Sequence, residues 1–157
     1  MARDLFAYVE QIRTTEKYFD VSRLGILHLL LAKKGACDLY ADHVIVDENG
    51  NDVDATLRLN ISTRSETPLS WTMSLKLHGV RIDGVDHEGR FPAVGGGWGR
   101  GWHRHVWEPA DENAERRKMP ITELDGVTSR DQFLTRGLRV MRIQLNAIDH
   151  GQELLLP

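Results

Sequence analysis

The sequence predicts an α+β fold in which a small antiparallel sheet of about four strands carries N-terminal helices and a long C-terminal helix packed on it. Two observations lead to this prediction. Apolar residues recur at helical spacing near both ends of the chain, and they alternate at strand spacing in the middle. The length of 157 residues is typical of one domain, so residues 1–157 are treated as a single domain.

The composition excludes several classes of protein. Hydrophobic residues make up 41% of the chain and charged residues 27%, which is usual for a globular protein. The formal net charge of -3 excludes a strongly basic protein that coats nucleic acid without specificity, although it leaves room for a local basic patch. The single cysteine, Cys37, excludes an internal disulfide and a zinc site built on two or more cysteines.

The sequence also gives no sign of a membrane segment. No apolar run reaches the roughly 18 residues that a membrane-spanning helix needs. The first residues carry charges and lack the apolar core of a signal peptide. We therefore expect a cytoplasmic protein that makes no contact with a membrane.

Two helices are predicted in the N-terminal part. The first helix is marked by apolar residues at helical spacing, which are Leu5, Phe6, Val9 and Ile12. The second is the apolar stretch 21–32, with Ser22 as the candidate N-cap and Gly35 as a stop. Its run 26–31 also fits a buried strand.

Strand periodicity begins near residue 40. The segments 40–46 and 53–61 flank Asn49-Gly50, a dipeptide typical of hairpin turns. The segment 70–83 is expected to be a third strand. Its apolar residues alternate and are expected on one face, namely Trp71, Met73, Leu75 and Leu77.

The last element is expected to be a long helix that runs to Gly151. Ser129 and Gln132 have the spacing of a capping box. The apolar stripe that follows comprises Phe133, Leu134, Leu138, Met141, Leu145 and Ile148.

The residues suited to chemistry gather around the glycine-rich segment 84–101, which we expect to be a long flexible loop. His103 and His105 follow in a short predicted strand, 102–108, where residues two apart point to the same face. His87 precedes the loop, which is long enough to bring it back toward that pair. The sequence therefore predicts a site at which three histidines converge.

Metal-independent cleavage of RNA is the first chemistry that this site suggests. One imidazole can act as general base and another as acid, an arginine can stabilise phosphoryl oxygens, and an aspartate can orient an imidazole. Tryptophan rings can stack on bases. The candidate catalytic residues are His87, His103, His105, Arg81 and Asp83, with Asp86 as the alternative to Asp83. The candidate substrate-binding residues are Arg100, Arg104, Trp98, Trp102 and Trp107. This mechanism needs no cofactor and no metal.

Two alternatives stay open for the same residues. The pair His103 and His105 supplies two metal ligands, and His87 with a carboxylate from Asp83, Asp86 or Glu88 would complete a site. The histidines can equally be packed, hydrogen-bonded residues beside a loop that is merely flexible.

Charge is segregated along the chain. The segment 35–57 contains acidic residues and no lysine or arginine. Arg136, Arg139 and Arg142 step by three and are expected along one side of the last helix. This row is either a solvated helix face or a ridge that contacts phosphate or a partner protein.

The pattern Arg81-x-Asp83-x-x-x-His87, a glycine-containing loop, and then His103-x-His105-x-Trp107 resembles the core of small prokaryotic proteins linked to mobile elements, which include the TumE-like toxins of toxin–antitoxin pairs. The resemblance covers about residues 57–145. It implies an α+β fold and a toxin that acts on RNA. The Gly- and Trp-rich insertion before His103 and the N-terminal apolar segments lie outside that pattern.

The leading functional hypothesis is a toxin-like ribonuclease of prokaryotic or phage origin with RNA as substrate. The alternative is a non-enzymatic binding or inhibitor protein of a phage or mobile element, which acts through contacts with a protein partner such as an antitoxin or a target. The oligomeric state does not follow from the sequence.

Overall fold

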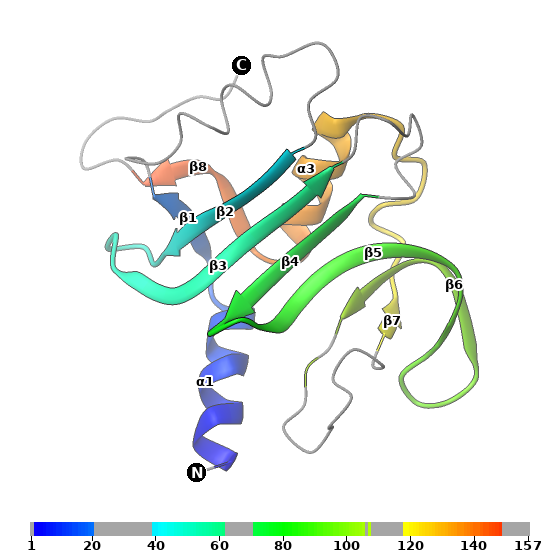
Figure 1. Cartoon of the computed structure of the whole chain (residues 1–157), viewed down its shortest axis with the longest axis horizontal. Helices are drawn as coiled ribbons and strands as arrows, with labels where there is room; N and C mark the ends of the chain where they lie inside the picture. The colour runs from blue at the N-terminus through cyan, green and yellow to red at the C-terminus, as the bar shows by residue number, and fades with distance from the viewer. Residues whose placement is uncertain (1, 21–38, 62–70, 106, 108–117, 149–157) are drawn as a thin grey trace.

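The computed structural model of this chain describes residues 2–20, 39–61, 71–105, 107 and 118–148 (Figure 1). These residues form two helices, α1 (Ala2–Thr14) and α3 (Arg130–Val140), and eight strands. The strands are β1 (Lys17–Asp20), β2 (Leu39–Val46), β3 (Asp52–Ile61), β4 (Thr72–Leu77), β5 (Val80–Pro92), β6 (Trp98–His105), β7 (Lys118–Pro120) and β8 (Ile143–Ile148).

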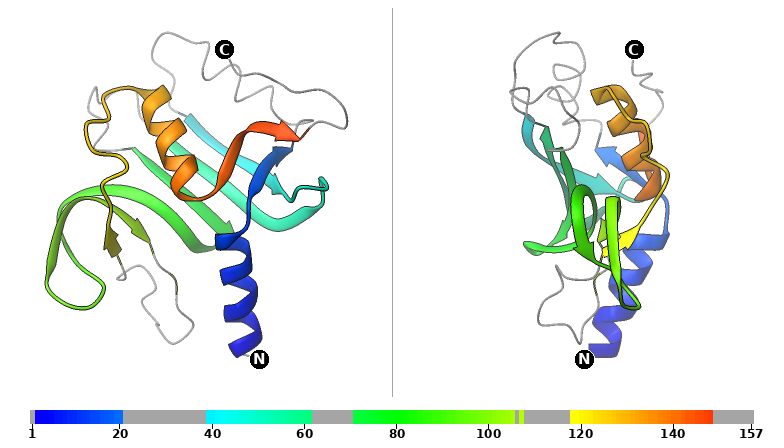
Figure 2. Two further views of the ribbon diagram at one scale, coloured as in Figure 1. Left: turned by 180° about the vertical axis from the view of Figure 1, so that it is seen from behind. Right: turned by 90° about the vertical axis from the view of Figure 1, so that its right-hand side faces the viewer.

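All eight strands belong to one sheet in the order β7-β6-β5-β4-β3-β2-β1-β8. Neighbouring strands are antiparallel except β1 and β8, which run parallel with Lys17 opposite Ile143. The sheet curls into a half-barrel, and both helices lie on its concave side (Figure 2). The core between the sheet and the helices contains Leu57, Leu59, Met73, Leu75, Val85, Phe133 and Leu138.

The predicted fold class is wrong in the size of the sheet and in the C-terminal helix. The sheet has eight strands in place of about four. Helix α3 ends at Val140, because Arg142 adopts a positive φ of 55° that stops the helix, and the chain then continues as β8. The apolar residues of 143–148 thus serve a strand that pairs with β1 at the other end of the chain.

Two further predictions fail in the middle of the chain. The segment 70–83 is not one strand, because His78 and Gly79 both adopt positive φ and form a two-residue turn between β4 and β5. The glycine-rich segment 84–101 is not a long loop. Most of it forms the paired strands β5 and β6, which are joined by the short connection 93–97.

Other predictions are confirmed. Helix α1 forms where apolar spacing predicted it, with Val9 and Ile12 buried, although Leu5 and Phe6 are exposed. The β2–β3 hairpin turns at residues 47–51, where Asp47 accepts hydrogen bonds from the backbone N–H groups of Asn49 and Asn51.

The N-cap at the start of α3 also forms, although the glutamine half of the predicted capping box bonds to Thr128 and not to Ser129. Ser129 Oγ accepts a hydrogen bond from the Gln132 N–H at 3.2 Å, and Gln132 Oε1 accepts one from the Thr128 N–H at 2.9 Å. The apolar segment 21–32 lies outside the described residues. In the part of the chain that is described, neither helix has the length and apolar character needed to cross a membrane.

Candidate functional site

Asp86, His103 and His105 form one group, the histidine cluster, between β5 and β6. Asp86 is the cross-strand partner of His103, and His105 lies two residues further along the same face. The neighbouring residues Val85 and Arg104 point to the opposite, core-facing side. The structure thus brings His103 and His105 together on one face, as the H-x-H spacing predicts, with ring centroids 5.1 Å apart.

A single carboxylate oxygen lies at the centre of the cluster. His105 Nε2 is 2.8 Å from Asp86 Oδ2, and His103 Nε2 is 4.0 Å from the same oxygen. His103 is fully buried and His105 is 6% exposed. The ligand atoms of the three residues lie within 4.8 Å of one another, and imidazoles with a carboxylate suit a transition-metal ion.

Arg81 holds the carboxylate of the cluster in place. Its Nη2 and Nη1 donate to the two oxygens of Asp86 at 2.8 and 3.1 Å, and Nη2 also donates to the Met73 carbonyl. Burial opposes ionisation of Asp86, but the hydrogen bonds from His105 and Arg81 outweigh it and hold the pKa of Asp86 well below its usual range. Arg81 therefore positions Asp86 and is not free to hold a phosphate.

Burial lowers the pKa of His103, so its imidazole is neutral near pH 7. Its Nδ1 lies 3.2 Å from the Gly101 carbonyl, which can only accept, so Nδ1 carries the proton. Nε2 therefore presents a lone pair.

Asp83 does not join the histidine cluster. It is fully buried on the core-facing side, where its two oxygens accept hydrogen bonds from Arg104 at 2.8 and 2.6 Å. Arg13 of α1 lies 3.8 Å from the same carboxylate. The hydrogen bonds that Arg104 donates to Asp83 raise the pKa of Arg104. Of the two aspartates proposed to orient an imidazole, Asp86 is the one so placed.

His87 lies on the other side of the sheet from His103 and His105. Its cross-strand partner is Trp102, and the two rings meet edge to face with centroids 5.1 Å apart. Trp102 is buried against Phe133. The predicted convergence of three histidines therefore does not form, because strand pairing in β5 and β6 replaces the expected loop.

The remaining predicted substrate-binding residues are dispersed. Trp98 is 64% exposed at the tip of the β5–β6 ribbon, with the Arg90 guanidinium 4.0 Å above its ring. Arg100 is exposed on the same ribbon. Trp107 is half-buried and packs against the core.

A second concentration of functional groups is a groove of about 440 Å³, called here the arginine groove. One arginine from β6 and three from α3 and the residues just after it converge on the groove, with one carboxylate among the described residues. The groove is lined by Arg104, Arg136, Arg139, Arg142, Glu123, Met119, Ile121 and Val140. Arg136, Arg139 and Arg142 thus lie together as predicted, but Arg142 comes from the segment after the helix.

The arginine groove keeps a positive charge. Arg136 donates to the Asp125 carbonyl and Arg142 to the Thr14 carbonyl, each at 2.9 Å, and a neutral carbonyl does not cancel the charge of a guanidinium. Among the residues that the structure describes, no carboxylate pairs with Arg136, Arg139 or Arg142. Within that part of the chain, Arg104 is the one arginine of the groove whose charge a carboxylate neutralises, that of Asp83.

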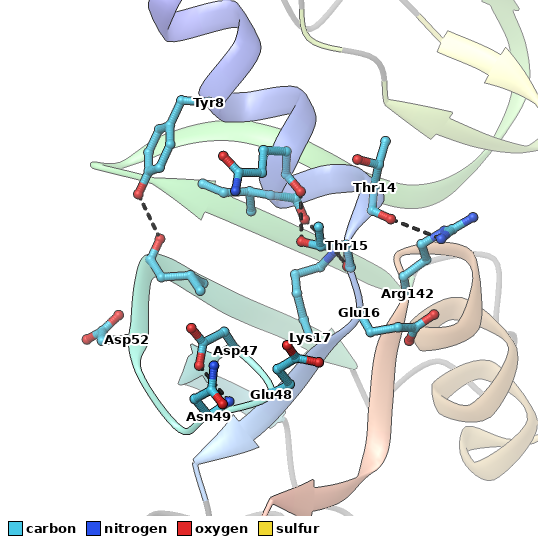
Figure 3. Close-up of a pocket in the computed structure, with 13 residues that line it drawn as sticks. Tyr8, Thr14, Thr15, Glu16, Lys17, Asp47, Glu48, Asn49, Asp52 and Arg142 are labelled. Atoms are coloured by element: carbon cyan, nitrogen blue, oxygen red, sulfur yellow. Dashed lines mark hydrogen bonds between the residues drawn. The ribbon is translucent and has the colours of Figure 1, made fainter.

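Another concavity lies between the end of α1 and the acidic β2–β3 turn (Figure 3). Lys17 is buried there, and its Nζ donates to the carbonyls of Ile12 and Thr15 at 2.6 and 2.9 Å. These carbonyls belong to the C-terminal end of α1, so the ammonium group caps that helix. Burial is the main influence on Lys17 and lowers its pKa to about 8.

Comparison with known proteins finds no family model, no curated protein and no solved structure that matches this chain. The resemblance to TumE-like toxins therefore stays a prediction. Sequence reasoning missed the contribution of Arg104 to a groove with the C-terminal arginines. It also preferred Asp83 to Asp86 as the aspartate that orients an imidazole. The reason is that the β-bulge between β4 and β5, which shifts their register, is not visible in the sequence.

Proposed function

We propose that this chain is a binding protein whose arginine groove receives an acidic segment of a partner protein. The observation that carries the proposal is the convergence of four arginines on one concavity that holds a single carboxylate among the described residues. Guanidinium groups bind carboxylates through paired hydrogen bonds, which gives geometric specificity as well as affinity. This function corresponds to the non-enzymatic alternative that the sequence suggests.

The lining of the groove favours a peptide over RNA. None of the described residues that line it is aromatic, so among them bases have no ring on which to stack. Its apolar residues, Met119, Ile121 and Val140, are suited to aliphatic side chains. Glu123 would repel a phosphate backbone, whereas a peptide can place its acidic side chains away from that carboxylate. An acidic segment with interspersed apolar residues therefore fits the groove best.

A fluorescent peptide of alternating Glu and Leu is the probe that tests this proposal. We expect saturable binding that weakens with added salt, because the attraction is electrostatic. The double variant Arg136→Ala/Arg139→Ala should weaken binding about tenfold or more, in line with the loss of two charge-assisted contacts. A Gln/Leu peptide and a single-stranded RNA should bind less tightly than the acidic peptide.

The matched control is the double variant Arg58→Ala/Arg90→Ala. It changes the net charge by the same amount, but its arginines lie outside the groove, where Arg58 pairs with Asp42 and Arg90 stacks on Trp98. Equal loss of affinity in both double variants would show that net charge alone attracts the peptide. Tighter binding of the RNA than of the peptide would reject a protein partner.

Metal-independent cleavage of RNA is a second proposal, favoured by the 2.8 Å contact between Asp86 and His105. A carboxylate that orients an imidazole is the arrangement of an acid–base pair. Defined single-stranded RNA should then be cut in the presence of EDTA by the unmodified protein and not by His105→Gln. Intact RNA under all conditions would reject this proposal while leaving the peptide-binding proposal standing.

A further inference from the structure

We propose that Asp86, His103 and His105 form a binding site for one divalent transition-metal ion, for which Zn²⁺ is the natural probe. The ligand set is one carboxylate oxygen with two imidazole nitrogens, and these atoms lie within 4.8 Å of one another. Two imidazoles and a carboxylate favour Zn²⁺ and its neighbours in the first transition row over Mg²⁺ or Ca²⁺, which prefer oxygen ligands. This inference does not depend on the arginine groove, and it competes with the metal-independent cleavage proposed above, because the same atoms of Asp86 and His105 would hold the ion.

The strongest evidence is the unsatisfied Nε2 of His103. This residue is fully buried, and its Nε2 has no hydrogen-bond partner within the described residues. Because Nδ1–H faces the Gly101 carbonyl, Nε2 bears a lone pair, and it points toward an oxygen of Asp86 at 4.0 Å. Two acceptors that face each other in a buried site are both satisfied when a cation lies between them.

The surroundings resemble those of a metal site in a second respect. A metal-bound histidine usually donates its other ring N–H to a carbonyl or a carboxylate, which sets the tautomer and orientation of the ring. His103 has this contact to Gly101 at 3.2 Å. Arg81 similarly anchors Asp86 through both oxygens, which leaves Oδ2 facing the two imidazoles.

His105 would become a ligand with a small rearrangement. Its Nε2 is now 2.8 Å from Asp86 Oδ2, within hydrogen-bond distance. When an ion takes the lone pair of Nε2, the neutral imidazole carries its proton on Nδ1, an atom that has no partner within the described residues. The partly exposed Asp86 offers the route by which the ion enters, since its side chain is 15% accessible while His103 is fully buried.

The test is a calorimetric titration of the untagged full chain with Zn²⁺ after EDTA treatment and removal of the chelator. We expect one ion per chain, an increase in the melting temperature, and no comparable binding of Mg²⁺. Co²⁺ should give the intense visible bands of a low-coordinate nitrogen–oxygen site. Absence of saturable Zn²⁺ binding by the wild-type protein would overturn the proposal without reference to any variant.

Variants then locate the site. Asp86→Asn, His103→Gln and His105→Gln should each weaken Zn²⁺ binding by about tenfold or more, the scale on which metal sites respond to loss of a supporting group. His87→Ala is the matched control, because His87 lies next to Asp86 in the chain but on the opposite face of the sheet, and it should bind Zn²⁺ like the wild type. Equal affinity in all four variants would place the ion elsewhere. The variant Arg136→Ala/Arg139→Ala should retain Zn²⁺ binding even if it loses the acidic peptide.

Discussion

Asp83 and Arg104 form a two-bond ion pair at 2.8 and 2.6 Å, with the carboxylate fully buried on the concave side of the sheet. Arg13 of α1 lies 3.8 Å from the same carboxylate. The pair therefore connects the β5–β6 ribbon to the N-terminal helix and stands at the edge of the arginine groove. Asp83 was predicted to orient an imidazole and Arg104 to bind a substrate, but their geometry makes Asp83 a positioning residue for Arg104.

Removal of the Asp83 charge should strongly destabilise the fold. Asp83→Asn leaves the guanidinium of Arg104 without its ionic partner, and breaking a buried pair in this way costs about 3–5 kcal/mol. Urea unfolding measures the loss. The control is Asp42→Asn, since Asp42 pairs with Arg58 at the surface and such pairs contribute about 1 kcal/mol or less. Similar losses in the two variants would show that the Asp83 pair is effectively solvated.

Stability should fall as the pH drops below about 6.5. Burial lowers the pKa of His43 below its ordinary value of 6.5, and burial acts on His103 in the same direction. As the pH falls through this range, these histidines are protonated more readily in the unfolded chain than in the folded protein. The stabilisation is therefore complete above pH 6.5 and is lost as the pH falls.

His43→Gln tests the contribution of one of these groups. The slope of the unfolding free energy against pH, measured between about pH 7.5 and 5, should become smaller in this variant. Part of the slope should remain, because His103 still titrates. A wild-type stability that is independent of pH over this range would contradict the prediction.

A methyl group at Gly99 should disturb the β5–β6 ribbon. A Cβ at this position would overlap the ring of Phe91, which is buried and lies with its centroid 4.4 Å from that of His103. Overpacking of this kind costs about 1–3 kcal/mol, so Gly99→Ala should unfold at lower urea and shift the His103 ring resonances in NMR spectra. Gly89→Ala, where nothing lies within 4 Å of the new methyl, should have neither effect.

The start of α3 should depend on one hydroxyl group. Ser129→Ala removes the acceptor for the Gln132 N–H and should cost about 1 kcal/mol of stability. Ser129→Asp keeps an acceptor at the same place and should restore most of the loss. Thermal unfolding of the three proteins distinguishes these outcomes, and an aspartate variant as unstable as the alanine variant would argue against the cap.

The sequence alone correctly identified features that depend on neighbouring residues. Helix α1, the β2–β3 hairpin and the cap at Ser129 are specified by spacing and turn chemistry within a few residues. The H-x-H spacing likewise placed His103 and His105 on one face, because alternation along a strand is a local property. Local backbone preferences are sufficient for such features.

Only the tertiary structure decided the features that depend on distant partners. Residues 143–148 form a strand because β1, at the opposite end of the chain, offers a parallel edge with which they pair. The pairing of β5 with β6 sets Asp86 opposite His103 and turns His87 to the other face. Likewise, the packing of α3 against the curled sheet brings Arg104 to the C-terminal arginines. The physical reason is that register and long-range pairing are determined by the burial of a whole face of the sheet, which no short segment encodes.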